Sequence, residues 1–154
     1  MVKIGYIFKA NLYDAFESDI EWMKHYGCVH IVVEDVKHET LRPLRKQLFA
    51  NLGTGDEIVV AKFSNALRGS RELASFIELC RIKNVRIISI HDRIDSRGKL
   101  FPETTVTEVL EMIGSLPAEA TALRTASAHV MRLQLNITSK KSTPKSENRE
   151  SREK

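Results

Sequence analysis

The 154-residue sequence is poor in the residues that stabilise small secreted proteins and metal-binding proteins. It has two cysteines, too few for a disulfide framework, and its five histidines lack the spacing of metal ligands. Cys28 and Cys80 both lie in apolar contexts, which is typical of buried thiols in a cytoplasmic protein. We therefore expect neither a disulfide nor a metal site.

Long hydrophobic runs are also absent. No apolar segment approaches the ~18–20 residues that a membrane span needs. The N-terminus leads from Met1 directly into an apolar strand pattern, without the features of a secretory signal. We therefore expect a cytoplasmic protein. With 42% hydrophobic residues, the chain can bury a core for one domain.

The formal net charge of +4 is unevenly distributed along the chain. Residues 138–154 hold six of the 24 basic residues and three of the 20 acidic ones, which leaves a net charge of only +1 on the remainder. A near-neutral body with a basic tail is a weak indication of nucleic-acid binding. We expect one domain over residues 1–136 and a disordered basic tail over 137–154.

Apolar runs alternate with segments of helical periodicity over the first two thirds of the chain. The runs are continuously apolar, as in a parallel sheet that helices cover on both faces. This order predicts an α/β fold with a mostly parallel open sheet of four to five strands flanked by helices. The expected strands span residues 2–8, 28–33, 57–61 and 85–90, and the expected helices span 11–26, 40–53 and 70–83.

The last third is helical in composition from residue 102 to residue 136. Pro117 interrupts this segment and should kink the helix or start a second one. Apolar residues form one stripe before the proline and a second stripe after it, and no strand remains to cover them. We therefore expect residues 103–135 to pair with another copy of the chain or with a related partner.

The most informative stretch runs from Gly55 to Ser70 and reads GDEIVVAKFSNALRGS. A Gly-Asp turn leads into a short apolar strand, which ends in a polar segment containing Lys62, Ser64, Asn65 and Arg68. Ligands of open parallel sheets bind at the carboxyl ends of the strands. We therefore expect binding or chemistry at this polar segment.

This stretch resembles the catalytic domain of serine recombinases, the resolvases and DNA invertases, where the pattern reads GDxxxVxKLDRLxRS. The resemblance extends over residues 3–135. Its other parts are the opening strand KIGYIF, the helix end at Gly27-Cys28, the helix start at Arg42-Pro43-Leu44 and the segment IDSRGKLF at 94–101. It implies a resolvase-type fold, DNA as substrate and no cofactor. A serine after the first strand attacks a DNA phosphodiester in that family, and arginines surround the phosphate.

The sequence departs from the family pattern at four central positions. The family's first strand ends in YxRVS, whereas this chain has Phe8 at the arginine position and Ala10 at the serine position. Counting from the Gly-Asp turn, the family's Asp and first Arg fall on Ser64 and Asn65. The resemblance therefore implies a catalytically degenerate recombinase, which acts as a dimerising or regulatory partner in DNA recombination.

Several residues keep two interpretations. Ser64 is either a relocated nucleophile, which would make the protein an active strand-exchange enzyme, or an ordinary polar residue ending a strand. Arg42 and Arg68, which match arginine positions of the family, are either phosphate ligands or solvated helix-terminus residues. Lys62 is either a DNA contact or a surface charge beside an acidic residue. Glu119 matches an acidic position on the family's long helix, although the arginine expected after it is absent.

Two further observations limit the function. No second apolar-periodic region follows the long helix, so we expect no helix-turn-helix for reading a DNA site, and only weak, non-specific DNA binding. His91 and Asp92 are adjacent at a strand end and point in different directions, which argues against an acid–base pair. A receiver-type signalling domain is a third alternative, but the strand ends lack the carboxylates it requires.

Overall fold

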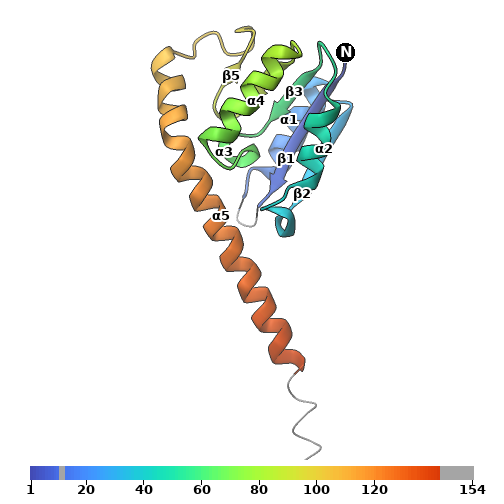
Figure 1. Cartoon of the computed structure of the whole chain (residues 1–154), viewed down its shortest axis with the longest axis vertical. Helices are drawn as coiled ribbons and strands as arrows, with labels where there is room; N and C mark the ends of the chain where they lie inside the picture. Colours follow the sequence, from blue (N-terminus) through green and yellow to red (C-terminus); the bar gives the residue numbers. More distant parts are fainter. Residues whose placement is uncertain (11–12, 143–154) are drawn as a thin grey trace, which may run out of the picture.

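A five-stranded sheet organises the part of the chain that the computed structural model describes, residues 1–10 and 13–142 (Figure 1). The strands lie in the order β2-β1-β3-β4-β5. Their bounds are β1 Lys3–Lys9, β2 His30–Asp35, β3 Glu57–Val60, β4 Arg86–Ser89 and β5 Ile94–Asp95. The first four strands pair in parallel and β5 is antiparallel to β4. The predicted α/β fold with a mostly parallel sheet is confirmed.

Helices cover both faces of this sheet. Their bounds are α1 Phe16–Tyr26, α2 Pro43–Asn51, α3 Phe63–Ala66, α4 Ser70–Ile82 and α5 Val106–Ser142, with a 3-10 turn, η1, at Val36–His38. The core on one face combines strand residues with side chains from α2, α3, α4 and α5. The core on the other face packs against α1, chiefly through Met23. Continuously apolar strands are therefore explained by burial on both faces.

Residues on successive positions of a strand divide between the two cores. Tyr6 and Val60 belong to the core under α2 and α4, whereas Ile7 and Val59 belong to the core under α1. As the sequence predicts, α1 ends at Gly27, which adopts a left-handed conformation with φ 104°. The chain can then turn back into β2.

The polar segment after β3 differs from its expected form. The chain enters the short helix α3 directly after Lys62, so Ser64 and Asn65 are buried helical residues and do not end a strand. The interpretation of Ser64 and Asn65 as polar residues that end a strand is wrong. Four helical residues are too few to produce a periodic apolar pattern, and β5, with two residues, escaped prediction for the same reason.

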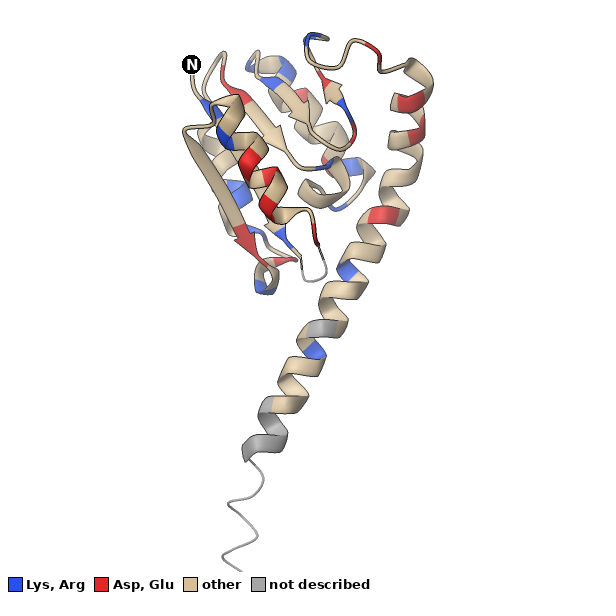
Figure 2. Ribbon diagram, turned by 180° about the vertical axis from the view of Figure 1, so that it is seen from behind, with Lys and Arg blue, Asp and Glu red and all other residues tan. Residues whose placement is uncertain are grey.

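The long helix α5 continues through Pro117 as a single helix and changes direction along its length (Figures 1 and 2). One side of its first half packs against the domain, where Leu116 and Ala120 are buried. Its second half extends away from the sheet. The helix runs past the expected boundary at Asn136 to Ser142, and residues 143–154 of the expected tail lie outside the described residues.

Candidate functional site

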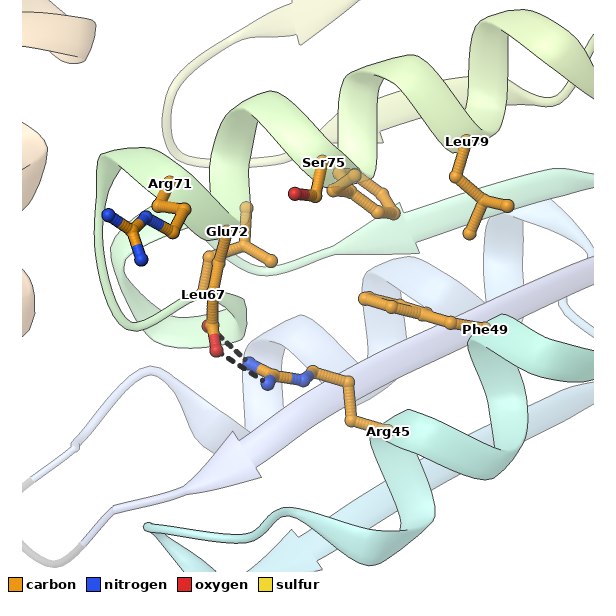
Figure 3. Close-up of a pocket in the computed structure, with 8 residues that line it drawn as sticks. Arg45, Phe49, Leu67, Arg71, Glu72, Ser75 and Leu79 are labelled. Carbon is orange, nitrogen blue, oxygen red and sulfur yellow. Dashed lines mark hydrogen bonds and ion pairs between the residues drawn. The ribbon is translucent and has the colours of Figure 1, made fainter.

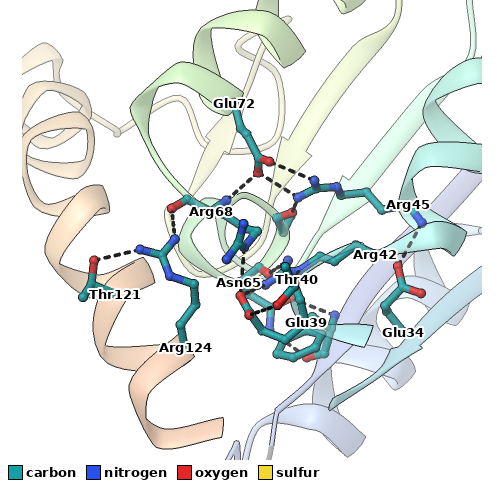
Figure 4. Close-up of polar contacts among 12 residues, drawn as sticks. Glu34, Glu39, Thr40, Arg42, Arg45, Asn65, Arg68, Glu72, Thr121 and Arg124 are labelled. Atoms are coloured by element: carbon teal, nitrogen blue, oxygen red, sulfur yellow. Dashed lines mark hydrogen bonds and ion pairs between the residues drawn. The ribbon is translucent and has the colours of Figure 1, made fainter. Parts of the chain in front are cut away.

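The carboxyl ends of β1 and β3 meet the loop before α2, the helix α3 and the middle of α5 (Figure 4). Ala10 follows β1 directly and is buried. Its methyl group carries no lone pair, so it can neither attack phosphorus nor accept a proton. The residue that the family pattern places at the nucleophile position is therefore chemically inert.

Asn65 joins the end of β1 to α3. Its Oδ1 accepts a hydrogen bond from the backbone N–H of Phe8 at 3.0 Å, and its Nδ2 donates to the backbone oxygen of Phe8 at 2.8 Å. An amide can donate and accept at once, whereas an arginine has no acceptor. Asn65 is thus suited to hold the strand end in a way that the family's arginine at this position is not.

Arg42 is buried beside this brace, with 1% of its surface exposed. Its Nη1 donates to the backbone oxygen of Asn65 at 2.6 Å, and its Nε donates to the backbone oxygen of Glu39 at 3.1 Å. The guanidinium carbon lies 4.3 Å from the centre of the Phe8 ring, a cation–π distance. Burial lowers the pKa of Arg42 from its ordinary value. The alternative interpretation of Arg42 as a solvated helix-terminus residue is wrong, and its role as a phosphate ligand stays a prediction.

The aromatic ring at position 8 is suited to the buried charge of Arg42. Two buried guanidiniums side by side would repel one another unless an anion lay between them. A phenyl ring at position 8 removes one of the two charges and offers its face to the other. The cluster of Phe8, Arg42 and Asn65 is therefore stable without a bound phosphate, and a phosphate could reach Arg42 only after these side chains moved.

A second set of ion pairs lies next to this cluster. Arg45 binds Glu72 through two hydrogen bonds of 2.9 and 3.0 Å and also donates to the backbone oxygen of Ala66. Glu72 in turn accepts the backbone N–H of Arg68 at 2.7 Å. Burial acts to raise the pKa of Glu72, but the hydrogen bonds from Arg45 and Arg68 outweigh it and lower the pKa overall. Glu72 is thus held in its charged form.

Arg68 completes the network at the surface. Its Nε donates to Oε1 of Glu39 at 2.9 Å, and its side chain is 29% exposed. Arg124 reaches from α5 to donate to the backbone oxygen of Arg68 (Figure 4). The contacts of Arg68 with Glu39 and Arg124, and of Arg45 with Glu72, were not predicted, because each joins residues that are 27 to 56 positions apart in the chain.

Comparison with known families supplies the decisive observation. Residues 14–134 match the family model described as "Resolvase, N terminal domain". The chain belongs to the serine recombinase family. This family acts in DNA recombination. A search of curated proteins finds no match. The matched range includes Arg42, Ser64 and Arg68 but begins after Ala10, so the assignment of residue 10 depends on its position at the end of β1.

Ser64 of this recombinase domain lies in α3 and is buried. It lines a pocket of about 380 Å³ between α3 and α5, together with Tyr13, Lys62 and Glu119. The guanidinium of Arg42 is bonded to backbone oxygens, and that of Arg68 to Glu39. The Ser64 hydroxyl makes no hydrogen bond to another of the residues that the structure describes. The geometry does not present Ser64 as an activated nucleophile.

Lys62 and Glu119 form an ion pair of 3.0 Å between the start of α3 and α5. The two side chains are 37% and 40% exposed, so the pair is a surface contact that contributes little to stability. This agrees with the interpretation of Lys62 as a surface charge beside an acidic residue. Its role in DNA binding stays a prediction.

His91 does not pair with the neighbouring Asp92. Its Nε2 lies 2.7 Å from Oδ1 of the buried Asp19 on α1, and the hydroxyl of Tyr13 donates to the other oxygen of Asp19. Burial raises the pKa of Tyr13, which keeps the hydroxyl protonated as a donor. Asp92 instead accepts the backbone N–H of Phe63 at 2.8 Å. These contacts fasten α1 and α3 to the sheet.

Within residues 1–10 and 13–142, no group of three or more histidine, cysteine, aspartate or glutamate side chains could hold a metal ion. Among the same residues, no helix is both long enough and apolar enough to cross a lipid bilayer.

Proposed function

We propose that this serine recombinase homologue does not cleave DNA, and that it acts as a dimerising or regulatory partner in recombination. The observation that carries the proposal is the cluster of Phe8, Arg42 and Asn65 beside Ala10. The side chain at residue 10 has no nucleophilic atom, and the buried arginine already has its partners within the protein.

The chemistry supports this proposal from two sides. Without an oxygen at residue 10, the covalent route to a phosphoserine intermediate is closed. Removing one donor that stabilises transition-state charge costs ~3–4 kcal/mol, or about a hundredfold to a thousandfold in rate. The family's arginines at positions 8 and 65 are both replaced, so a nucleophile elsewhere would also lack most of its electrostatic support.

Self-association through α5 is supported by the apolar residues it exposes. Val106, Leu110 and Ile113 recur at helical spacing on the first half, and Leu133 and Ile137 recur on the second half. Leu133 is 49% exposed on a helix that leaves the domain, where no described element covers it. Exposed apolar stripes of this kind are typical of interfaces. Residues 103–135 would then carry the contact with a second copy or with an active recombinase.

Weak DNA contact is supported by the charge along α5. The first half carries acidic residues, whereas residues 120–142 contain no aspartate or glutamate and include Arg124 and Arg132 (Figure 2). The distal half is thus the part of the helix that would approach phosphates, together with Arg68 and Lys62. Such contacts are non-specific and weaken as salt concentration rises.

The test of the lost activity is a search for a covalent protein–DNA adduct. The protein is incubated with a supercoiled plasmid carrying paired sites of an active resolvase, and that resolvase serves as the positive control. We expect no adduct with this protein. An adduct that maps to Ser64 and disappears in Ser64→Ala would overturn the proposal in favour of a relocated nucleophile.

Light scattering at several salt concentrations, with and without duplex DNA, tests the role as a partner. We expect a mass above that of one chain without DNA, and DNA binding that is lost at high salt. A monomer under all conditions, including a mixture with the active resolvase, would contradict the dimerising role.

A further inference from the structure

A half-open groove lies between α2 and α4, beside the ion-pair network (Figure 3). None of the residues at the family's active-site positions discussed above lines this groove. Its volume is about 290 Å³, near the lower end of ligand pockets in proteins. The lining is divided into an apolar floor and a polar rim: the floor is Phe49, Leu67, Phe76 and Leu79, and the rim is Arg45, Arg71, Glu72 and Ser75.

The floor is built around a pair of aromatic rings. Phe49 from α2 and Phe76 from α4 stack with their centres 4.9 Å apart and their planes at 27°. Phe76 is buried, whereas Phe49 and Leu79 are only half-buried and present apolar surface to the groove (Figure 3). A flat apolar body can therefore enter and remove this surface from water.

The rim carries one uncompensated positive charge. Arg45 and Glu72 neutralise each other through their two hydrogen bonds. Arg71 is exposed and forms no ion pair with an acidic residue in the described part of the chain. Ser75 lies one helical turn further along α4, so its hydroxyl and the Arg71 guanidinium line the same side of the groove (Figure 3).

We propose that this groove binds a small amphipathic anion, with a flat apolar body about the size of two fused rings and a carboxylate or phosphate group. The body lies over Phe49 and Leu79, and the anionic group binds Arg71 with Ser75 as a second donor. The proposed binding site does not include residue 10 or Ser64. The proposal therefore does not depend on whether the protein cleaves DNA.

The test titrates 2-naphthoate into isotope-labelled protein and follows the backbone amide signals by NMR. Neutral 2-naphthylmethanol and cationic 2-naphthylmethylamine provide matched probes with the same ring system. We expect saturable shifts confined to α2, α4 and their flanks. The anion should bind about fivefold more tightly than the neutral probe, because the added ion pair is solvent-exposed.

Three variants distinguish binding in the groove from non-specific association with the protein surface. Arg71→Gln should abolish the preference for the anion, whereas Arg81→Gln, on the same helix but outside the groove, should leave it unchanged. Ser75→Phe should fill the groove and abolish binding of all three probes. Since residue 75 is exposed, its thermal unfolding should stay that of the wild type. Shifts scattered over the surface, or an anion preference that survives Arg71→Gln, would overturn the proposal.

Discussion

At the scale of single residues, the departures from the family pattern form a consistent set. Phe8 supplies a ring for Arg42, and the Asn65 side chain hydrogen-bonds to both the N–H and the C=O of Phe8. Each replacement would be unfavourable without the others, because a buried charge or a buried backbone group would lose its partner. In the structure, these three side chains form a contact between β1, α3 and the residue that precedes α2.

Replacing Asn65 tests this structural role. Asn65→Ala leaves the buried N–H of Phe8 without its partner and removes one of the two hydrogen bonds to the C=O of Phe8, so we expect a loss of about 1–3 kcal/mol in the free energy of unfolding. Urea denaturation measures the loss. Asn51→Ala, at an exposed position on α2, is the control and should change the free energy by less than about 0.5 kcal/mol. Equal effects of the two variants would contradict the role of Asn65.

Restoring the nucleophile alone should not restore cleavage. Ala10→Ser supplies the missing hydroxyl, but the arginine positions 8 and 65 stay without guanidiniums and Arg42 stays buried. We expect no covalent adduct with supercoiled DNA from this variant, and an unfolding midpoint near that of the wild type. Adduct formation by Ala10→Ser would show that the remaining arginines are sufficient.

At the scale of elements, α5 has two parts with different environments. Leu116 is buried in the core beside α3, whereas Leu133 is exposed on the distal half. The segment from Leu116 to Arg124 contacts the domain in three ways. It packs against α3, Glu119 forms the ion pair with Lys62, and Arg124 donates to the backbone oxygen of Arg68, just before α4. Stability and association should therefore depend on different residues of the same helix.

A matched pair of leucine variants separates these two parts. Leu116→Ala should lower the free energy of unfolding by about 2–5 kcal/mol, because it leaves a cavity in the core. Leu133→Ser should leave the unfolding of the isolated domain nearly unchanged and should reduce self-association. Denaturation and sedimentation velocity report the two effects. If both variants associated as the wild type does, the proposed interface on α5 would be contradicted.

At the scale of the whole molecule, a polar network joins β5 to the amino ends of β3 and β4, whereas the candidate site lies at the carboxyl ends of the strands. Arg86 on β4 donates to Asp95 at 2.8 and 2.6 Å and to Glu57 at 2.8 Å. Hydrogen bonds from Arg86, together with backbone N–H groups of the following loop, hold the pKa of Asp95 well below its usual range, although burial opposes them. This network fastens β5 and its loop to the parallel strands.

This network makes stability depend on pH in the acid range. The pKa of Asp95 is lower in the folded state than in the unfolded state, so its contribution is fully present above the ordinary value of 3.8 and is lost as pH falls below it. We expect the thermal midpoint to fall steeply below about pH 4. In Asp95→Asn the midpoint should be lower at pH 7 and should depend less on pH in this range. An unchanged acid slope in the variant would assign the effect to other carboxylates.

The sequence by itself determined the α/β class, the four main strands, the helix ends at Gly27 and near Gly53, and the family. These depend on apolar periodicity and on turn residues, which act over a few neighbouring positions. The spacing of the motif also predicted which four positions depart from the family pattern.

Only the tertiary structure decided what the altered positions do. Phe8, Arg42 and Asn65 lie far apart in the chain, and so do Arg45 and Glu72, so no local pattern records that they bind one another. Arg42 is buried, and no local pattern showed this. Its burial depends on which helices cover the strand ends. The course of α5 past Pro117 likewise depends on the packing of Leu116 and Ala120 against the domain, a contact between distant segments that local propensity does not encode.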